Sequence, residues 1–433
     1  MFGYTDYRWW PCLVANVEGR APVLVSTYKR AVMVKLGIVL LAAAFCTMAA
    51  CSQVSTESSA AKRAERLNAS KTKARELVDM ERYQEAVSVL EPLSGEASGD
   101  PQVFVMLGES YRELERYDEA IRSYEAAIRL AYHDYHAHLK LANLLMDRGR
   151  TGRALTEYEL AARLGENDPV ARYDYGLALR EMGKNKMALV EWKAAYQLES
   201  GNPTYAEAMG IGLTDSDPTD AIEYFETAAE LGAEGAGYYN NFGMALQNTG
   251  DRAAAARRFG RAVGLEPANE SYRFNLAAAY MNMGAYREAL AEWEALVERF
   301  GPRWSYTIYR GEALLERGRY AEAIETVAAI VSEYESGSLE NDGNRLDRTP
   351  PQLADALQVL AMSHRSVGDK PQALAYIERA VELDPDNVTY LNNYGVILAE
   401  NGSIDRAKAQ WRRVLEIDAG NVTAVKNLSV IDP

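Results

Sequence analysis

Histidine and cysteine side chains are the residues best suited to metal or nucleophilic chemistry, and the chain has four histidines and three cysteines. His133, His136 and His138 are close together in the segment AYHDYHAH. Two metal ligands on one helix share a face when they are three or four residues apart, and His136 and His138 are two apart. We therefore interpret these as surface histidines, except that the repeat described below places His138 toward the core. We expect no metal site.

Other signatures of catalysis are missing from the sequence. It has no Walker phosphate loop, no HExxH zinc motif, no nucleophile elbow and no CxxC pair. The glycine-rich segment 232–237 follows a predicted helix, whereas phosphate loops follow a strand. The formal net charge of −15 disfavours nucleic acid, which requires a basic face. We expect no enzyme activity, cofactor, small-molecule substrate or nucleic-acid partner.

The cysteines lie near the amino terminus, at Cys12, Cys46 and Cys51, so the rest of the chain cannot form disulfides. Cys51 follows the apolar run 36–50, LGIVLLAAAFCTMAA. This run is shorter than the roughly 20 residues of a membrane-spanning helix. Basic residues precede it and a Ser/Thr-rich stretch follows it. The pattern is typical of a secretory signal peptide.

The segment Met48-Ala49-Ala50-Cys51 resembles the lipobox of bacterial lipoproteins, in which a cysteine after small residues becomes lipidated and forms the new amino terminus. The resemblance implies a lipid anchor at Cys51, and Ser52 is compatible with sorting to the outer membrane. An alternative is a buried apolar helix or signal anchor with a chance cysteine. The lipobox interpretation divides this part of the chain into three segments. Residues 1–32 would be a wrongly assigned upstream start (a mis-start) or an extended leader, 33–50 a signal peptide, and 51–68 the lipidated cysteine with a flexible tether.

A 34-residue period organises the chain from about residue 67 to residue 420. A glycine between the two helices of most repeats can adopt the positive φ with which helices commonly end. Residues four apart share a helix face, so two of the columns below predict the buried face of a second helix. The alanine column is Ala86, Ala120, Ala154, Ala188, Ala221, Ala255, Ala289, Ala323, Ala373 and Ala407. Small residues about twelve positions earlier are Ala74, Gly108, Ala142, Gly176, Gly210, Gly243, Ala277, Gly311, Ala361 and Gly395. Large residues four positions after the alanines are Leu90, Tyr124, Tyr158, Trp192, Phe225, Phe259, Trp293, Val327, Ile377 and Trp411.

A 34-residue helix hairpin with small residues at positions eight and twenty and a large one at position twenty-four resembles the tetratricopeptide repeat. The resemblance implies an all-α, right-handed superhelical solenoid of about ten hairpins with a carboxyl-terminal capping helix. Small residues would let the helices approach, while the large ring fills the space between successive repeats.

The repeat frame sets the boundaries. We expect repeats one to eight in 69–333, a loop insertion in 334–350, and repeats nine and ten with the cap in 351–433. The cap should be a helix over 422–430 with Asn421 as its N-cap. Repeat five is one residue short, which predicts a tightened turn near 214–217.

Proteins with this repeat bind peptides in the concave groove of the first helices, so residues at groove positions are the candidates for partner binding. Amides both donate and accept hydrogen bonds, which suits an extended peptide backbone. Asn241 and Asn275 share the sixth position of adjacent repeats and should stand side by side as a short ladder. An alternative is that these are solvated residues on a helix face. The candidates are Asn240, Asn241, Met244, Gln247, Asn248, Phe274, Asn275, Met281, Asn282, Asn392 and Asn393.

Lys140 and Asn143 approach the chaperone-type carboxylate clamp, but the lysine is one position late, so we predict no chaperone-tail binding. The sequence as a whole predicts a non-catalytic protein-binding scaffold, lipid-anchored in the bacterial cell envelope at the outer membrane and facing the periplasm. It resembles the tetratricopeptide lipoproteins of tight-adherence and type IV pilus assembly. Alternatives are an adaptor for peptidoglycan hydrolases and a soluble cytoplasmic scaffold.

Overall fold

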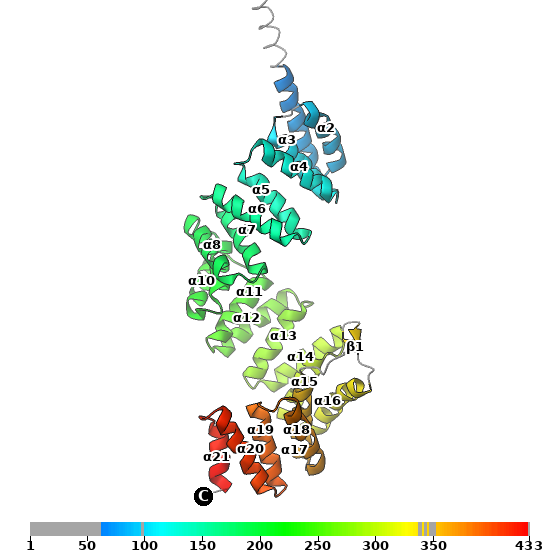
Figure 1. The fold of residues 1–433 in the computed structure, drawn as a ribbon, viewed down its shortest axis with the longest axis vertical. Coiled ribbons are helices and arrows are strands. Elements are labelled where there is room, and N and C mark those ends of the chain that lie inside the picture. The colour runs from blue at the N-terminus through cyan, green and yellow to red at the C-terminus, as the bar shows by residue number, and fades with distance from the viewer. Residues whose placement is uncertain (1–61, 97–98, 337–339, 342–343, 346–351, 432–433) are drawn as a thin grey trace, which may run out of the picture. The chain divides into compact units, whose positions relative to one another are not determined.

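The computed structural model describes residues 62–96, 99–336, 340–341, 344–345 and 352–431 (Figure 1). The predictions for 1–32, the signal peptide, Cys51 and most of the tether lie outside these residues. The described chain divides into two compact units, the first ending at Arg148 and the second beginning at Gly149. Each unit is described by itself.

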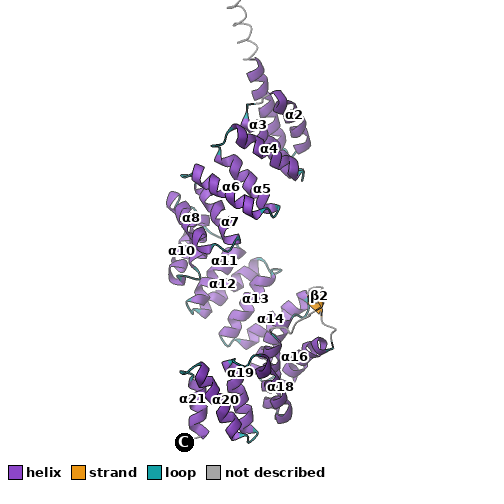
Figure 2. Ribbon diagram, in the orientation of Figure 1, coloured by secondary structure: helices purple, strands orange, loops and turns teal. Residues whose placement is uncertain are grey.

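The described residues are helical except for turns and one pair of two-residue strands (Figure 2). The first unit begins with a helix at 62–79. Its other helices are α2 (Tyr83–Glu96), α3 (Pro101–Glu113), α4 (Tyr117–Leu130) and α5 (Tyr135–Asp147).

The second unit contains first and second helices in alternation, so the all-α prediction is confirmed. It holds α6 (Thr151–Leu164), α7 (Pro169–Glu181), α8 (Asn185–Leu198), α9 (Pro203–Leu213), α10 (Pro218–Glu230), α11 (Ala236–Asn248), α12 (Arg252–Leu265), α13 (Glu270–Asn282), α14 (Tyr286–Phe300), α15 (Trp304–Glu316), α16 (Tyr320–Glu335), α17 (Leu353–Val367), α18 (Lys370–Leu383), α19 (Val388–Glu400), α20 (Ile404–Ile417) and α21 (Val422–Ile431). Between α16 and α17, β1 (Glu340–Asn341) pairs antiparallel with β2 (Asn344–Arg345).

Each helix of a unit contacts the next one in sequence, and first helices of neighbouring repeats also contact each other, as α9 does α11 and α15 does α17. Several first helices begin at capping side chains: the carboxylate of Asp168 accepts from the backbone N–H of Ala171, and Asp100 and Asn202 cap α3 and α9 similarly. A capping oxygen satisfies a backbone N–H that has no partner within the helix.

The turns inside the hairpins depend on positive φ. Gly149, Gly183, Gly250, Gly284, Gly318, Gly368 and Gly402 all have φ between 69° and 85°, which confirms the glycine prediction. In repeats one and two the same position is held by Glu81 and Glu115, at φ 58° and 57°. A residue with a Cβ is strained in this conformation by about 1–2 kcal/mol.

Repeat five departs from the predicted turn. The missing residue is lost from the helix: α9 has 11 residues, whereas α7 has 13. The backbone N–H groups of Ser216 and Asp217 both donate to the carbonyl of Leu213, at 3.0 and 2.8 Å. Asp217 then caps α10. Without a positive-φ glycine, the chain leaves the helix early and turns through four residues, so the expectation of a tightened turn is wrong.

The hairpin core consists of a large ring packed against a small residue sixteen positions earlier. All ten large residues of the column are at most 6% exposed, and the ten alanines at most 1%. A Cβ added to Gly176 would lie 2.5 Å from Cδ1 of Trp192, and one on Gly108 would lie 2.5 Å from Cε1 of Tyr124. Real carbon atoms do not approach so closely, so glycine permits the ring to lie against the first helix.

The ring also reaches the next repeat, as the sequence predicts. The ring of Phe225 stacks on Phe242 of α11, with centroids 5.3 Å apart. The Phe225 side chain thereby joins two repeats into one core.

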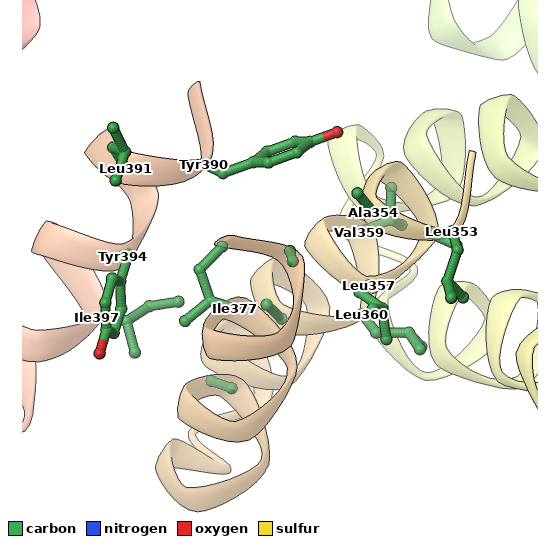
Figure 3. Packing of buried hydrophobic residues seen from close by; sticks show 14 of the residues in the cluster. Leu353, Ala354, Leu357, Val359, Leu360, Ile377, Tyr390, Leu391, Tyr394 and Ile397 are labelled. Atoms are coloured by element: carbon green, nitrogen blue, oxygen red, sulfur yellow. The ribbon is translucent and has the colours of Figure 1, made fainter. Parts of the chain in front are cut away.

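The last repeats share one hydrophobic cluster that extends from α15 to α21 (Figure 3). In Figure 3 the ring of Tyr390 extends from α19 toward the helix that carries Ala354. Its hydroxyl donates to Asp355 of α17. Beyond this cluster, Asn421 caps α21 by accepting from the N–H of Ala424 at 3.0 Å. The predicted capping helix is confirmed.

The packing of ring against glycine gives a test with two helical glycines of opposite character. We expect Gly176→Ala to lower the free energy of unfolding by about 1–3 kcal/mol, because the new Cβ overlaps the Trp192 ring. In α12, a Cβ added at Gly264 would have no atom within 4 Å, so Gly264→Ala should raise the free energy of unfolding by about 0.5–1 kcal/mol through helix propensity. Thermal and urea unfolding measure both, and shifts of the same sign would contradict this packing.

Candidate functional site

The first helices of the second unit carry two hollows, which we call pocket A and pocket B. Pocket A, of about 470 Å³, lies on α7, α8, α9 and α11. Pocket B, of about 440 Å³, lies on α13, α14, α15 and α17. Both volumes fall in the range of about 300–1,000 Å³ that is typical of ligand pockets. Several predicted groove residues belong to these pockets: Asn241 and Met244 to pocket A, and Met281 and Asn282 to pocket B.

Pocket A has an apolar floor and a polar rim. Leu189, Trp192 and Ile211 form the floor, and Arg180 and Lys186 supply positive charge at the rim. The side chain of Asn241 is hydrogen-bonded to Glu207 of α9. Burial raises the pKa of Glu207, while the hydrogen bond from Asn241 and the charge of Arg180 lower it. Asn241 thus connects two first helices at the edge of the pocket.

The predicted amide row is present, but its pairing is shifted by one position. Asn275 of α13 donates from Nδ2 to Oδ1 of Asn240, at 2.8 Å, rather than to Asn241. Asn240 is only 9% exposed, and its own Nδ2 lies 3.7 Å from the sulfur of Met244. A partly buried amide pair of this kind fixes the approach of α13 to α11.

Other predicted groove residues serve mainly the packing of the repeats. Phe274 packs edge-on against Trp293, with centroids 5.1 Å apart. Asn248 donates from Nδ2 to the carbonyl of Thr214, at 2.9 Å, and so satisfies the irregular turn of repeat five. The buried Asn392 donates to Asn421, while Asn393 is half-buried and Gln247 is exposed.

Pocket B combines aromatic walls with carboxylates. Trp293, Tyr309 and Tyr286 supply rings, and the rim holds Glu312, Glu316, Asn282 and Gln358. The pKa of Glu312 is raised to about 7, mainly by burial and in addition by the negative charges of Asp355 and Glu316. Among the described residues, no hydrogen bond or ion pair reaches the Glu312 carboxylate. Its charge is therefore uncompensated.

The acidic residues are the part of the site that reasoning from the sequence missed. Asp174, Glu207 and Glu312 occupy the sixth, fifth and ninth positions of their repeats, which are groove positions. Burial is the main reason that the pKa values of all three are raised, to about 6 for Asp174. The available signal was their place in the repeat frame. Their burial depends on neighbouring repeats, which the frame does not describe.

The remaining sequence candidates lie in the first unit. His138 is buried and its Nε2 lies 3.0 Å from the carbonyl oxygen of Tyr132, which confirms its core position, while His133 and His136 are exposed. Lys140 forms an ion pair with Glu109. Over the described ranges, we find no group of three or more His, Cys, Asp or Glu side chains arranged to hold a metal ion.

The hairpin geometry agrees with a comparison with known families. Residues 105–171, 274–338 and 359–422 match the family model of the tetratricopeptide repeat. These segments are tetratricopeptide repeats. The photosystem I assembly protein Ycf3 of Cyanophora paradoxa is 32% identical over 113 residues, which are 24% of this chain and 58% of that protein. The match therefore spans somewhat more than half of that relative's length.

Solved tetratricopeptide structures are similar in fold. PilF of Pseudomonas aeruginosa is 18% identical, with a TM-score of 0.45 over 50% of this chain and 99% of that one. Cut9–Hcn1 of the APC/C is 13% identical, with a TM-score of 0.45 over 84% and 83% of the two chains. YrrB, described as having an unusual peptide-binding site, is 18% identical, with a TM-score of 0.38 over 42% and 95%. These similarities concern the fold alone.

In the part of the chain that the structure describes, no helix combines the length and the apolar character that crossing a bilayer requires.

The raised pKa of Glu312 predicts a specific pH dependence of stability. The folded state binds this proton more tightly than the unfolded state, whose pKa is near 4.5, so stability falls as the pH rises from about 4.5 to about 7. Glu312→Gln removes the buried charge and should raise the melting temperature by about 2–5 °C at pH 8 but change it little at pH 4.5. Differential scanning calorimetry at the two pH values measures this. The exposed Glu298→Gln is the matched control, and an equal effect of Glu312→Gln at both pH values would contradict the assignment.

Proposed function

We propose that this protein is a non-catalytic scaffold that holds an extended segment of a partner protein on the first helices of its second unit. The observation that carries the proposal is pocket A, where the amide of Asn241 and the thioether of Met244 border an apolar floor. An extended peptide needs backbone hydrogen bonds and places for alternate side chains. Pocket A offers both, on rigid helices.

The hydrogen bonds around Asn241 explain how it would hold a backbone. With its amide N–H₂ directed to the Glu207 carboxylate, the Asn241 carbonyl oxygen still has acceptor capacity for an N–H of the partner. The partly buried Asn240–Asn275 pair holds α11 in place, so little conformational entropy is lost when the peptide binds. In place of the ladder, one half-buried amide, Asn241, is supported by this pair.

The site of action that we propose is the bacterial cell envelope, with the chain anchored through a lipid on Cys51 at the outer membrane and facing the periplasm. The apolar run 36–50 and the small residues before Cys51 support this location. Within the envelope we favour a role in building a pilus or secretion apparatus, which the order of signal, tether and repeats supports. The Ycf3 relative is named for the assembly of another complex, photosystem I, and we propose an assembly role for this protein by analogy.

Partner capture tests the scaffold proposal. We expect the double change Asn241→Ala with Met244→Ala to reduce crosslinked partner in a membrane pull-down by about tenfold, because each lost hydrogen bond costs about 0.5–1.5 kcal/mol and the apolar contact adds to this. Helicity and melting should change little. The control is Arg257→Ala, an exposed residue on the second helix α12. Equal capture by the double variant and the control would remove pocket A from the proposal.

Lipid anchoring is tested separately at Cys51. We expect Cys51→Ser to stop processing and leave an unlipidated precursor that no longer labels with a palmitate analogue. Labelling and fractionation of membranes measure the outcome. Mature, labelled protein from the Ser variant would rule out Cys51 as the anchor and leave the scaffold proposal in place.

A further inference from the structure

Repeat seven packs its tryptophan differently from two other repeats with tryptophan at the same position. Trp192 donates from Nε1 to the carbonyl of Tyr173, at 3.3 Å, and Trp411 donates to the carbonyl of Asn392, at 3.2 Å. In both cases the acceptor is nineteen residues earlier, in the first helix of the same repeat. Trp293 is fully buried, yet its Nε1 has no acceptor among the described residues.

The residue in front of the ring explains the difference. Trp192 and Trp411 lie against Gly176 and Gly395, where a Cβ would come within 2.6 Å of several ring atoms. Repeat seven has Ala277 there, so the indole cannot take the same place. It stacks instead on Tyr309 of the next repeat, with centroids 5.2 Å apart and planes at 23°. Trp293 thereby becomes part of the wall of pocket B.

A buried N–H without an acceptor destabilises a fold by about 1–3 kcal/mol. Pocket B carries a second unfavourable feature, since the half-buried Glu312 lies near the negative charges of Glu316 and Asp355 with no cation paired to it. Asp355 is engaged by the hydroxyl of Tyr390, which leaves Glu312 and Glu316 as the carboxylates at the pocket. The second feature would be relieved by an occupant that brings a cation to the Glu312 carboxylate.

We propose that pocket B receives the side chain of a lysine or arginine from an extended segment of the partner protein. The aliphatic part of such a side chain would pack against Met281 and Leu315, and its charge would lie between the Glu312 carboxylate and the aromatic rings. Cations bind over aromatic faces as well as to carboxylates, and the two attractions add in a site shielded from water. An acidic or apolar side chain would leave the carboxylate unpaired.

This inference rests on the scaffold function proposed above and specifies what the partner must contain. Pocket A carries two cations, Arg180 and Lys186, and one carboxylate, Asp215. The two pockets therefore differ in the side chains that they favour.

The test uses the full chain and a nonapeptide library with randomised flanks and a central residue fixed as lysine, arginine, norleucine or glutamate. At pH 8 we expect the lysine and arginine pools to bind at least about tenfold more tightly than the norleucine pool, which corresponds to about 1.4 kcal/mol. Glu312→Gln should reduce this preference to less than about twofold, while the exposed Glu298→Gln on α14 should retain it. Circular dichroism confirms that the variants are folded.

The location is checked by the indole ¹⁵N–¹H signal of Trp293, identified by its loss in Trp293→Phe, which should move when the best lysine peptide binds. Equal binding of the lysine and norleucine pools, an undiminished preference in Glu312→Gln, or an unmoved Trp293 signal would each overturn the inference. If partner capture still depends on Asn241 and Met244 in that event, the scaffold function stands and only the basic-residue pocket is lost. If capture does not depend on them either, pocket A is also removed from the scaffold proposal.

Discussion

The contact between a large side chain of the second helix and a small residue of the first helix, glycine or alanine, is the interaction on which the helix hairpins depend. Where the small residue is glycine the large side chain can lie directly against the first helix, as Trp192 does at Gly176. The same ring then contacts the next first helix, as Phe225 does Phe242. One side chain thus sets the spacing inside a repeat and the contact between repeats. Without it, neither helix of the hairpin buries enough apolar surface to be stable.

This constraint also determines where function can be located. The second helices supply the rings and the alanines, so their inner faces are occupied by packing. The first helices use glycine or alanine at the eighth position and leave neighbouring positions free for other residues. Pockets A and B lie where these free positions of successive first helices meet. Repeat seven has Ala277 where repeats four and ten have glycine, and its Trp293 ring stacks on Tyr309 in the wall of pocket B.

The carboxylates on the first helices reduce the stability of the fold that carries them. Burial raises the pKa of Glu312 to about 7 and of Asp174 to about 6, so both charges are less favourable in the folded chain than in the unfolded one. Uncharged side chains at these positions would make the folded protein more stable. Glu312 lines pocket B, and a residue that lowers stability at an accessible pocket is characteristic of a binding site, where the ligand supplies the missing interaction.

The sequence by itself determined the hairpins, their number and most of their boundaries, because the glycine, alanine and ring columns repeat every 34 residues and act within one repeat. Positive φ at Gly183 and Gly250 and the cap at Asn421 follow from the same local rules. The tertiary structure decided features that depend on contacts between repeats: the pairing of Asn275 with Asn240, the early end of α9 and the burial of Glu312. The twist between successive first helices places residues of different repeat positions opposite each other, so adjacency cannot be read from the repeat frame. Local periodicity fixes each helix, whereas the depth and charge of a pocket depend on side chains that three or four helices bring together.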